Sequence, residues 1–248
     1  MSAERSSRRS PPRARGARVE AFDPFGQPHP AVAVDVILFT IAGRELRVLL
    51  IDRQLPPFAG HKALPGGFVR VDESLDEAAA RELEEEAGVR VRWLEQLYTF
   101  GALERDPARR VISVAYFALI DAAGLAPRAG TDATAVGWFD VRRLPKLAFD
   151  HAQMIAYAHE RLRYKTEYAP VAFQLLPNDL TLGQLQAVYE VILGKPLDKR
   201  NFRRKVLGLD ILEPTGELRQ EGRGRPAALY RFRARRFADL GGGVVLDF

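Results

Sequence analysis

The chain has 248 residues, no cysteine and a formal net charge of +5 at pH 7. Its hydrophobic fraction of 47% is ample for a core, and its length allows one large domain or two modest ones. The lack of cysteine excludes disulfides and thiolate metal sites, which suits a reducing cytoplasm. No apolar run approaches the roughly 18 residues of a membrane span, and the basic N-terminal segment lacks the apolar stretch of a secretory signal.

Charge is divided unevenly along the chain. Residues 1–18 carry a net charge of +5, residues 19–169 carry −4 and residues 170–248 carry +4. The basic C-terminal block indicates a polyanionic partner for that block. Residues 1–22 are rich in Arg, Ser and Pro and have little to bury, so we expect a disordered basic tail there.

Structured elements are expected once the basic tail ends. Alternating valines over residues 31–41, a turn at 42–45 and a second apolar stretch at 46–52 predict a β-hairpin. Three further strands are predicted at residues 93–100, 111–120 and 136–139. Asp150 is placed to cap a helix over residues 150–165.

Between these strands, residues 75–87 are predicted to form a helix with well-defined ends. Ser74 and Glu77 have the spacing of a capping box, in which each side chain accepts a hydrogen bond from the other residue's backbone. Gly88 fits the left-handed position just past the last turn. Both ends of the helix are therefore fixed by local signals.

Three carboxylates on one face of this helix are the main chemical signal of the chain. Glu82, Glu85 and Glu86 stand at positions i, i+3 and i+4, where like charges repel one another. A bound Mg2+ would turn that cost into a benefit, because this ion prefers carboxylate oxygens together with substrate phosphates. The alternative is a solvated acidic face, which is the usual role of a Glu-rich helix.

The segment before the helix is rich in glycine. Residues 64–67 read Leu-Pro-Gly-Gly, which we expect to form a tight turn whose backbone can approach a ligand closely. With the helix, this segment completes a longer pattern made of Gly67, Glu73, Arg81-Glu82-Leu83, Glu85-Glu86 and Gly88-Val89. These residues have the spacing of the Nudix box, so the chain resembles a Nudix hydrolase. Members of that family cleave nucleoside diphosphates linked to another moiety, using divalent metal ions.

The resemblance implies a fold and a set of roles. It implies an α/β Nudix fold, an α/β/α sandwich, over residues 23–168, and metal-assisted attack of water on a pyrophosphate. Glu82, Glu85 and Glu86 would be the catalytic residues and the ligands of Mg2+ or Mn2+, with the backbone carbonyl of Gly66 as a further ligand. The residues that support the box would be Gly67, Glu73, Arg81 and Gly88, with Arg81 pairing with Glu73.

Other positions are less constrained by the resemblance. Lys62 stands where family members with the Ala-Leu-Pro-Gly-Gly segment usually have Trp, and it could alter strand packing or contact a phosphate. Arg53, Phe58 and Glu104 are candidates for binding the nucleotide, chosen from their position alone.

The C-terminal block, residues 169–248, has a different organisation. A capping box at residues 181–184 opens an apolar helix that ends at Gly194, and Asp198 caps a basic helix over residues 199–207. This order of helix, turn and basic helix is typical of a helix-turn-helix.

A strand pair with a basic loop follows the two helices. Strand-like stretches at residues 211–212 and 227–232 flank a Gly- and Arg-rich loop at 214–226, which completes a winged helix-turn-helix. The basic helix could enter the major groove, and the loop arginines could reach phosphates or the minor groove. The DNA-binding candidates are Lys199, Arg200, Asn201, Arg203, Arg204, Lys205, Arg223 and Arg225. A solvated basic face is the alternative.

Stretches of the C-terminal block are similar to one particular group of regulators. Residues 197–205, 214–216 and 225–227 resemble the Nudix-related transcriptional regulators of NAD metabolism. In that family, the Nudix domain senses ADP-ribose or a related nucleotide, and the winged helix represses genes of NAD synthesis or sugar use. The resemblance implies a double-stranded DNA operator and a homodimer, with an interface on the helix at 150–165 or on the Nudix sheet.

Three functions therefore remain open. The first is a nucleotide-sensing transcriptional repressor. The second is a Mg2+-dependent pyrophosphatase acting on ADP-ribose or a nucleotide sugar, which rests on the intact carboxylates. The two can coexist, because a sensor that hydrolyses its inducer resets itself. The third is a hydrolase whose C-terminal block binds protein or RNA, although no aromatic stacking platform lies between the basic residues.

Overall fold

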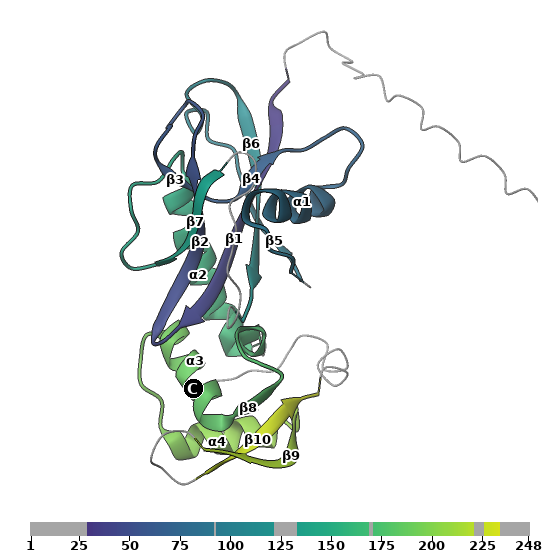
Figure 1. The fold of residues 1–248 in the computed structure, drawn as a ribbon, viewed down its shortest axis with the longest axis vertical. Helices are drawn as coiled ribbons and strands as arrows, with labels where there is room; N and C mark the ends of the chain where they lie inside the picture. The colour runs from purple at the N-terminus through teal and green to yellow at the C-terminus, as the bar shows by residue number, and fades with distance from the viewer. Residues whose placement is uncertain (1–28, 92, 122–132, 169–170, 221–225, 234–248) are drawn as a thin grey trace, which may run out of the picture.

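A computed structural model describes residues 29–91, 93–121, 133–168, 171–220 and 226–233. It shows a mixed α/β unit followed by a smaller unit with its own three-stranded sheet (Figure 1). The expected basic tail at residues 1–22 lies outside the described residues. Within the described residues, no helix is both long and apolar enough to cross a membrane.

One mixed sheet forms the centre of the first unit. Its strands are β1 (Ala31–Ala42), β2 (Glu45–Arg53), β3 (Lys62–Ala63), β4 (Gly66–Phe68), β5 (Glu95–Phe100), β6 (Val111–Leu119) and β7 (Ala133–Asp140). The main order is β3-β2-β1-β6-β5, with β4 also paired to β1 and β7 to β2. β1 and β6 are parallel, whereas the other pairs are antiparallel. The hairpin and the three later strands predicted from the sequence are all present.

Two helices cover the opposite faces of this sheet: α1 (Leu75–Ala87) and α2 (His151–Tyr168). Val36 packs in the cluster on the α1 side, whereas its neighbour Ile37 packs with Ile155 of α2. Because both faces are covered, β1 is buried along eight successive residues and its valines do not mark a solvent face. This arrangement confirms the predicted α/β/α sandwich.

The ends of α1 are as the sequence predicted. The Ser74 hydroxyl accepts from the backbone N–H of Glu77, and the Glu77 carboxylate accepts from the backbone N–H of Ser74 at 2.8 Å. Gly88 has φ 64°, in the left-handed region, and its N–H donates to the carbonyl of Glu84 at 2.9 Å. These caps set the rotation of the helix and thereby the direction of its carboxylate face.

The second unit has the predicted winged-helix order. Its elements are η1 (Val171–Leu175), β8 (Asp179–Thr181), α3 (Leu182–Leu193), α4 (Lys199–Gly208), β9 (Leu212–Arg219) and β10 (Ala227–Phe232). Thr181 caps α3 through the predicted capping box, and Asp198 caps α4. The sheet order is β8-β10-β9, with antiparallel pairs.

The prediction of a loop over residues 214–226 is wrong for residues 214–219, which belong to a strand. β9 continues to Arg219, so that Pro214 lies opposite Tyr230 within the strand pair. Proline and glycine usually end strands, but β9 is at the edge of its sheet, where a missing N–H donor and the φ of 84° at Gly216 are tolerated.

The two units share one hydrophobic core. Buried side chains form a single cluster that runs from the α2 face of the Nudix-like sheet through η1 to α3 and α4. Within it, the ring of Phe173 stacks on Phe232 with centroids 4.4 Å apart. The short η1 segment, which the sequence did not reveal, is therefore a packed joint.

Phe173→Ala is expected to destabilise both units together, lowering the free energy of unfolding by about 3 kcal/mol because a buried ring is removed from the shared core. Urea unfolding followed by fluorescence and circular dichroism measures this loss. Leu218→Ala, at a side chain 68% exposed, is the matched control and should change stability little. A loss confined to one of two separate transitions would contradict a shared core.

Candidate functional site

Arg81 of α1 donates hydrogen bonds to three carboxylates of the candidate site. Its Nε and Nη2 donate to the two oxygens of Glu73 at 2.8 and 2.5 Å. Its Nη1 donates to Glu82 at 2.6 Å and to Glu85 at 3.0 Å. The Arg81–Glu73 pair expected from the sequence is therefore present, and one guanidinium reduces the repulsion along the acidic face of α1.

These contacts shift the ionisation of the groups involved. The hydrogen bonds from Arg81 lower the pKa of Glu73 to about 2. Because this pKa is depressed, the pair stabilises the fold at neutral pH, and its contribution is lost only as pH falls from the ordinary 4.5 towards 2. Burial raises the pKa of Glu82, and the hydrogen bond from Arg81 opposes that shift.

The glycine pair lies in a strand, so the tight turn predicted over residues 64–67 is wrong. Gly66 and Gly67 pair with Asp35 and Val34 in antiparallel register between β4 and β1. A side chain on Gly67 would overlap the carboxylate of Glu82, and one on Gly66 would overlap the carbonyl oxygen of Val34. Glycine is required here because β4 lies tightly against both α1 and β1.

Glu86 lies at the edge of a cavity of about 120 Å³ next to the helix. Its carboxylate accepts from the backbone N–H of Gly66 at 2.8 Å. Arg53 lines the same cavity, with its guanidinium 4.8 Å from the ring centre of Phe149. Carboxylate, guanidinium and aromatic ring thus face one hollow at the end of the Nudix motif.

The other two nucleotide-binding candidates do not line this cavity. Phe58 lies behind it, where its ring meets Phe149 edge-on at 5.0 Å. Glu104 is exposed, whereas the adjacent Arg105 is buried and lines the cavity. Lys62, in the position where a Trp is usual, pairs with Asp52 at 2.5 Å, so it joins β3 to β2.

A buried polar network that lines the cavity was missed by the sequence analysis. Asp35 accepts from the Ser113 hydroxyl at 2.5 Å, and its second oxygen is 3.3 Å from Nε2 of His151. Burial raises the pKa of Asp35, but His151, Ser113 and Arg105 together lower it below its ordinary value. A lone Asp within an apolar strand was the available signal, although its partners are distant in sequence.

The same network reaches the start of α2. Nδ1 of His151 accepts from the backbone N–H of Leu64 at 2.9 Å, so this histidine joins α2 to the segment before β4. Arg105 donates to Asp150 at 2.9 Å. The first turn of α2 and the segment leading into β4 are therefore fixed to the floor of the cavity.

The carboxylates are a suitable donor set for a hard divalent ion, because all are oxygen ligands within little more than one helical turn. Among the described residues, however, no three His, Asp or Glu side chains converge on one point. Glu82 and Glu85 are directed to Arg81, and Glu86 is directed to the N–H of Gly66. A bound ion would replace the contacts of Arg81 with Glu82 and Glu85.

The candidate DNA interface is the solvent face of α4. Phe202 and Val206 face inward, where Phe202 meets Tyr189 at 5.4 Å. The opposite side carries the exposed Lys199, Arg200, Arg203 and Arg204 and the half-buried Asn201 and Lys205. Nη2 of Arg204 donates to Oδ1 of Asn201 at 2.8 Å. Arg223 and Arg225, also expected to bind DNA, lie outside the described residues.

Comparison with known families matches both units. Residues 29–158 match the NUDIX domain, and residues 172–232 match the NrtR DNA-binding winged helix domain. The chain is 37% identical over 209 residues to the "ADPR responsive transcriptional repressor NtrR" of Acinetobacter baylyi, covering 83% of each protein.

Solved structures of related proteins are similar over the same regions. The chain superposes on Shewanella oneidensis NrtR complexed with a 27mer DNA with a TM-score of 0.73 and 39% identity, covering 84% of this chain and 95% of that one. For the NUDIX domain of Shewanella oneidensis NrtR complexed with ADP ribose, the TM-score is 0.52 at 37% identity, covering 57% and 94%.

The fold and the site thus define a Nudix domain joined to a winged helix-turn-helix. Similarity extends through both units and the joint between them. The chain belongs to the NrtR family.

Gly67→Ala is expected to lower the free energy of unfolding by about 2 kcal/mol, because the added methyl group forces β4 away from Glu82. Chemical denaturation measures the change. Gly183→Ala is the control, since a methyl group there meets nothing closer than 3.6 Å. Equal stability of the two variants would show that β4 and α1 are not tightly packed.

Proposed function

We propose that this protein is a transcriptional repressor that binds operator DNA through its winged helix and senses ADP-ribose or a closely related nucleotide at its Nudix site. The observation that carries the proposal is the combination, in one chain with one core, of an exposed basic α4 and a complete Nudix box.

The DNA-binding part rests on the construction of α4. Phe202 anchors the helix in the core, so its four exposed basic side chains point away from the protein. A helix of this kind fits the major groove, where arginine and asparagine can read base edges and lysine can contact phosphates. The relative from Shewanella oneidensis was crystallised with DNA, which supports the same role for this winged helix.

The sensing part rests on the cavity beside α1. Arg53 supplies positive charge, and Phe149 supplies a ring against which an apolar part of the ligand could lie. The Shewanella Nudix domain binds ADP-ribose and the Acinetobacter relative is described as responsive to it. A nucleoside diphosphate linked to a sugar is therefore the proposed ligand.

A second function, hydrolysis of this ligand, is favoured by the intact carboxylates. Glu82, Glu85 and Glu86, with the carbonyl of Gly66, would hold Mg2+ or Mn2+. The ion would supply charge neutralisation and an activated water at the pyrophosphate. Arg81 would then keep Glu73 as its partner, and the pair would hold the loop against α1. A repressor with this activity would destroy its own signal.

We also propose that the protein acts as a homodimer, because operators read by helix-turn-helix proteins are usually two-fold symmetric. Tyr98 of β5 and Tyr157 of α2 support an interface near α2 and the Nudix sheet, because they are 52% and 41% exposed with ring centres 5.1 Å apart. A molecular mass measured by light scattering would distinguish a monomer from a dimer.

Arg203→Ala is expected to weaken binding to the DNA upstream of the protein's own gene by about tenfold, because an exposed cation of α4 is lost. Titration of labelled DNA at several salt concentrations measures the affinity and its salt dependence. Arg90→Ala, on the Nudix unit, is the charge-matched control. Addition of ADP-ribose should release the wild-type protein from the DNA. Salt-insensitive binding, or equal binding by both variants, would contradict the proposed DNA interface.

Glu86→Gln is expected to reduce Mg2+-dependent release of AMP from ADP-ribose by about a hundredfold or more, as a metal ligand is lost. Glu84→Gln is the matched control, since Glu84 lies on α1 and pairs with Arg90 on the surface. Turnover that survives in Glu86→Gln would contradict the assigned role. If the wild type binds ADP-ribose tightly without turnover, the sensing function stands and the hydrolytic function is excluded.

A further inference from the structure

Three arginines are among the described residues that line the cavity at the Nudix motif, and two of them already donate to other groups of the protein. Arg105 is 8% exposed and donates to the carboxylates of Asp35 and Asp150. The Nε of Arg53 donates to the backbone carbonyl of Pro57 at 2.7 Å. Much of the hydrogen-bonding capacity of these two guanidinium groups is therefore used within the fold.

Arg109 is the third arginine, and its donors are available. Its side chain is exposed, and within the described part of the chain it makes no hydrogen bond and no ion pair. The carboxylate of Asp106, which lies in the same loop, accepts from the backbone N–H of Ala108 at 2.8 Å instead. The guanidinium of Arg109 can therefore offer all of its N–H donors to a ligand.

The ring of Phe68 holds the guanidinium of Arg109 at the cavity. The central carbon of the guanidinium lies over this ring, 5.5 Å from its centre. Phe68 is the last residue of β4, is 47% exposed and lines the same cavity. A cation over an aromatic ring is attracted to the face of the ring without pairing its donors with an acceptor atom. The contact therefore positions Arg109 and leaves its donors to a ligand.

Both members of this pair stand on backbone that other arginines hold. The carbonyl of Phe68 accepts from Nη2 of Arg81 at 3.3 Å, so Phe68 also contacts the Nudix box. In the loop that carries Arg109, Nη1 of Arg110 donates to the carbonyl of Ala102 at 3.1 Å. A cation that is positioned before binding loses less conformational freedom on binding than a free surface side chain does.

A phosphate group is the ligand chemistry that this arrangement fits. A guanidinium with free donors can contact two phosphate oxygens at once. Glu86 and Asp106 line the same cavity, and their carboxylates would repel an anionic ligand. Arg81 already pairs with the carboxylates of α1, so the attraction requires an arginine that no carboxylate of the protein neutralises.

We propose that Arg109, positioned by Phe68, binds the pyrophosphate of the nucleotide through a contact that itself needs no divalent ion. The inference rests on the proposed function of the Nudix site as a sensor of ADP-ribose. It separates recognition from turnover, because Arg109 attracts the ligand whereas the carboxylates of α1 act in hydrolysis. Release of the DNA then depends on Arg109 even when no ligand is hydrolysed.

The test is a calorimetric titration of the full-length protein with ADP-ribose in the presence of EDTA. Arg109→Gln is expected to bind at least about tenfold more weakly than the wild type, because a charge-assisted contact is lost. Arg143→Gln is the matched control, since Arg143 is exposed, follows β7 and does not line the cavity. A thermal melt checks that both variants fold.

The outcomes separate this proposal from the function on which it rests. A wild type that does not bind ADP-ribose would remove the proposed sensor and Arg109 with it. A wild type that binds, with equal affinity in Arg109→Gln, would overturn the role of Arg109 and leave the sensor standing. Equal weakening by Arg143→Gln would reveal general electrostatic attraction and would also overturn that role.

Phe68→Leu tests whether the ring acts through Arg109. It is expected to weaken binding by about threefold when Arg109 is present and to have no further effect in the Arg109→Gln background. The same loss in both backgrounds would show that the ring acts on the ligand independently, and would overturn its role as the support of Arg109.

The DNA titration gives a second readout. Arg109→Gln should bind the DNA upstream of the protein's own gene with wild-type affinity, because Arg109 lies on the Nudix unit. It should need about tenfold more ADP-ribose for release, in proportion to its weaker binding of the nucleotide. Release at the wild-type concentration of ADP-ribose would contradict the proposal.

Discussion

Three glutamates within little more than one turn of α1 repel one another, and the architecture around that helix depends on how their charge is balanced. Arg81 donates to two of them and to Glu73 in the preceding loop. The N–H of Gly66 donates to the third, at a point where a side chain on β4 would overlap the backbone of β1. Loop, strand and helix are thus positioned by the same electrostatic requirement, and ADP-ribose binding or hydrolysis would take place where they meet.

The two parts of the chain that are proposed to bind polyanions are built on opposite principles. α4 presents cations directly, so its attraction to DNA should decrease as the salt concentration rises, because the release of counterions from DNA is then less favourable. The face of α1 presents carboxylates, which repel a pyrophosphate unless a divalent ion lies between them. A single chain can therefore respond to salt at one end and to divalent ions at the other, without either surface competing for the other's ligand.

Local signals were enough to predict much of this structure. Capping boxes and C-terminal glycines act within one turn, so the limits of α1 and α3 could be predicted from their own residues. β9 could not, because an edge strand accepts Pro214 and Gly216 only in the context of its sheet. The Asp35 network was also hidden, since even Ser113 is 78 positions away. The Nudix motif revealed the carboxylates, but the role of Arg105 could be recognised only from the folded structure.

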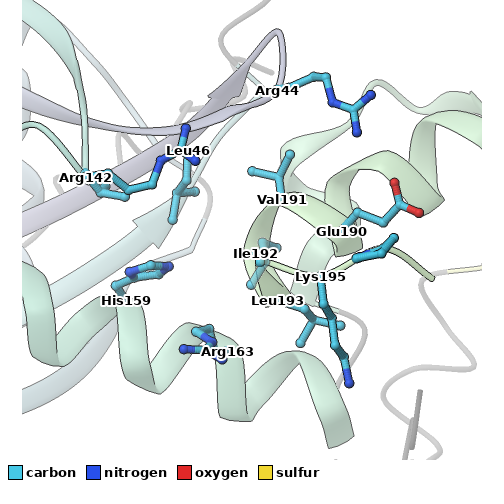
Figure 2. A pocket seen from close by; sticks show the side chains of 13 residues that line it. Arg44, Leu46, Arg142, His159, Arg163, Glu190, Val191, Ile192, Leu193 and Lys195 are labelled. Carbon is cyan, nitrogen blue, oxygen red and sulfur yellow. The ribbon is translucent and has the colours of Figure 1, made fainter.

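α2 lines two cavities, one near each of its ends. His151 lines the cavity at the Nudix motif from the first turn of α2. About 18 Å further along the helix axis, Arg163 lines a second cavity, between α2 and the end of α3 (Figure 2). Arg105 holds the first turn through Asp150, which makes that end a fixed pivot. A tilt of about 10° about this pivot would carry the far end by about 3 Å. The helix has the geometry of a lever, by which a small adjustment under a bound nucleotide would become a displacement beside the DNA-binding unit.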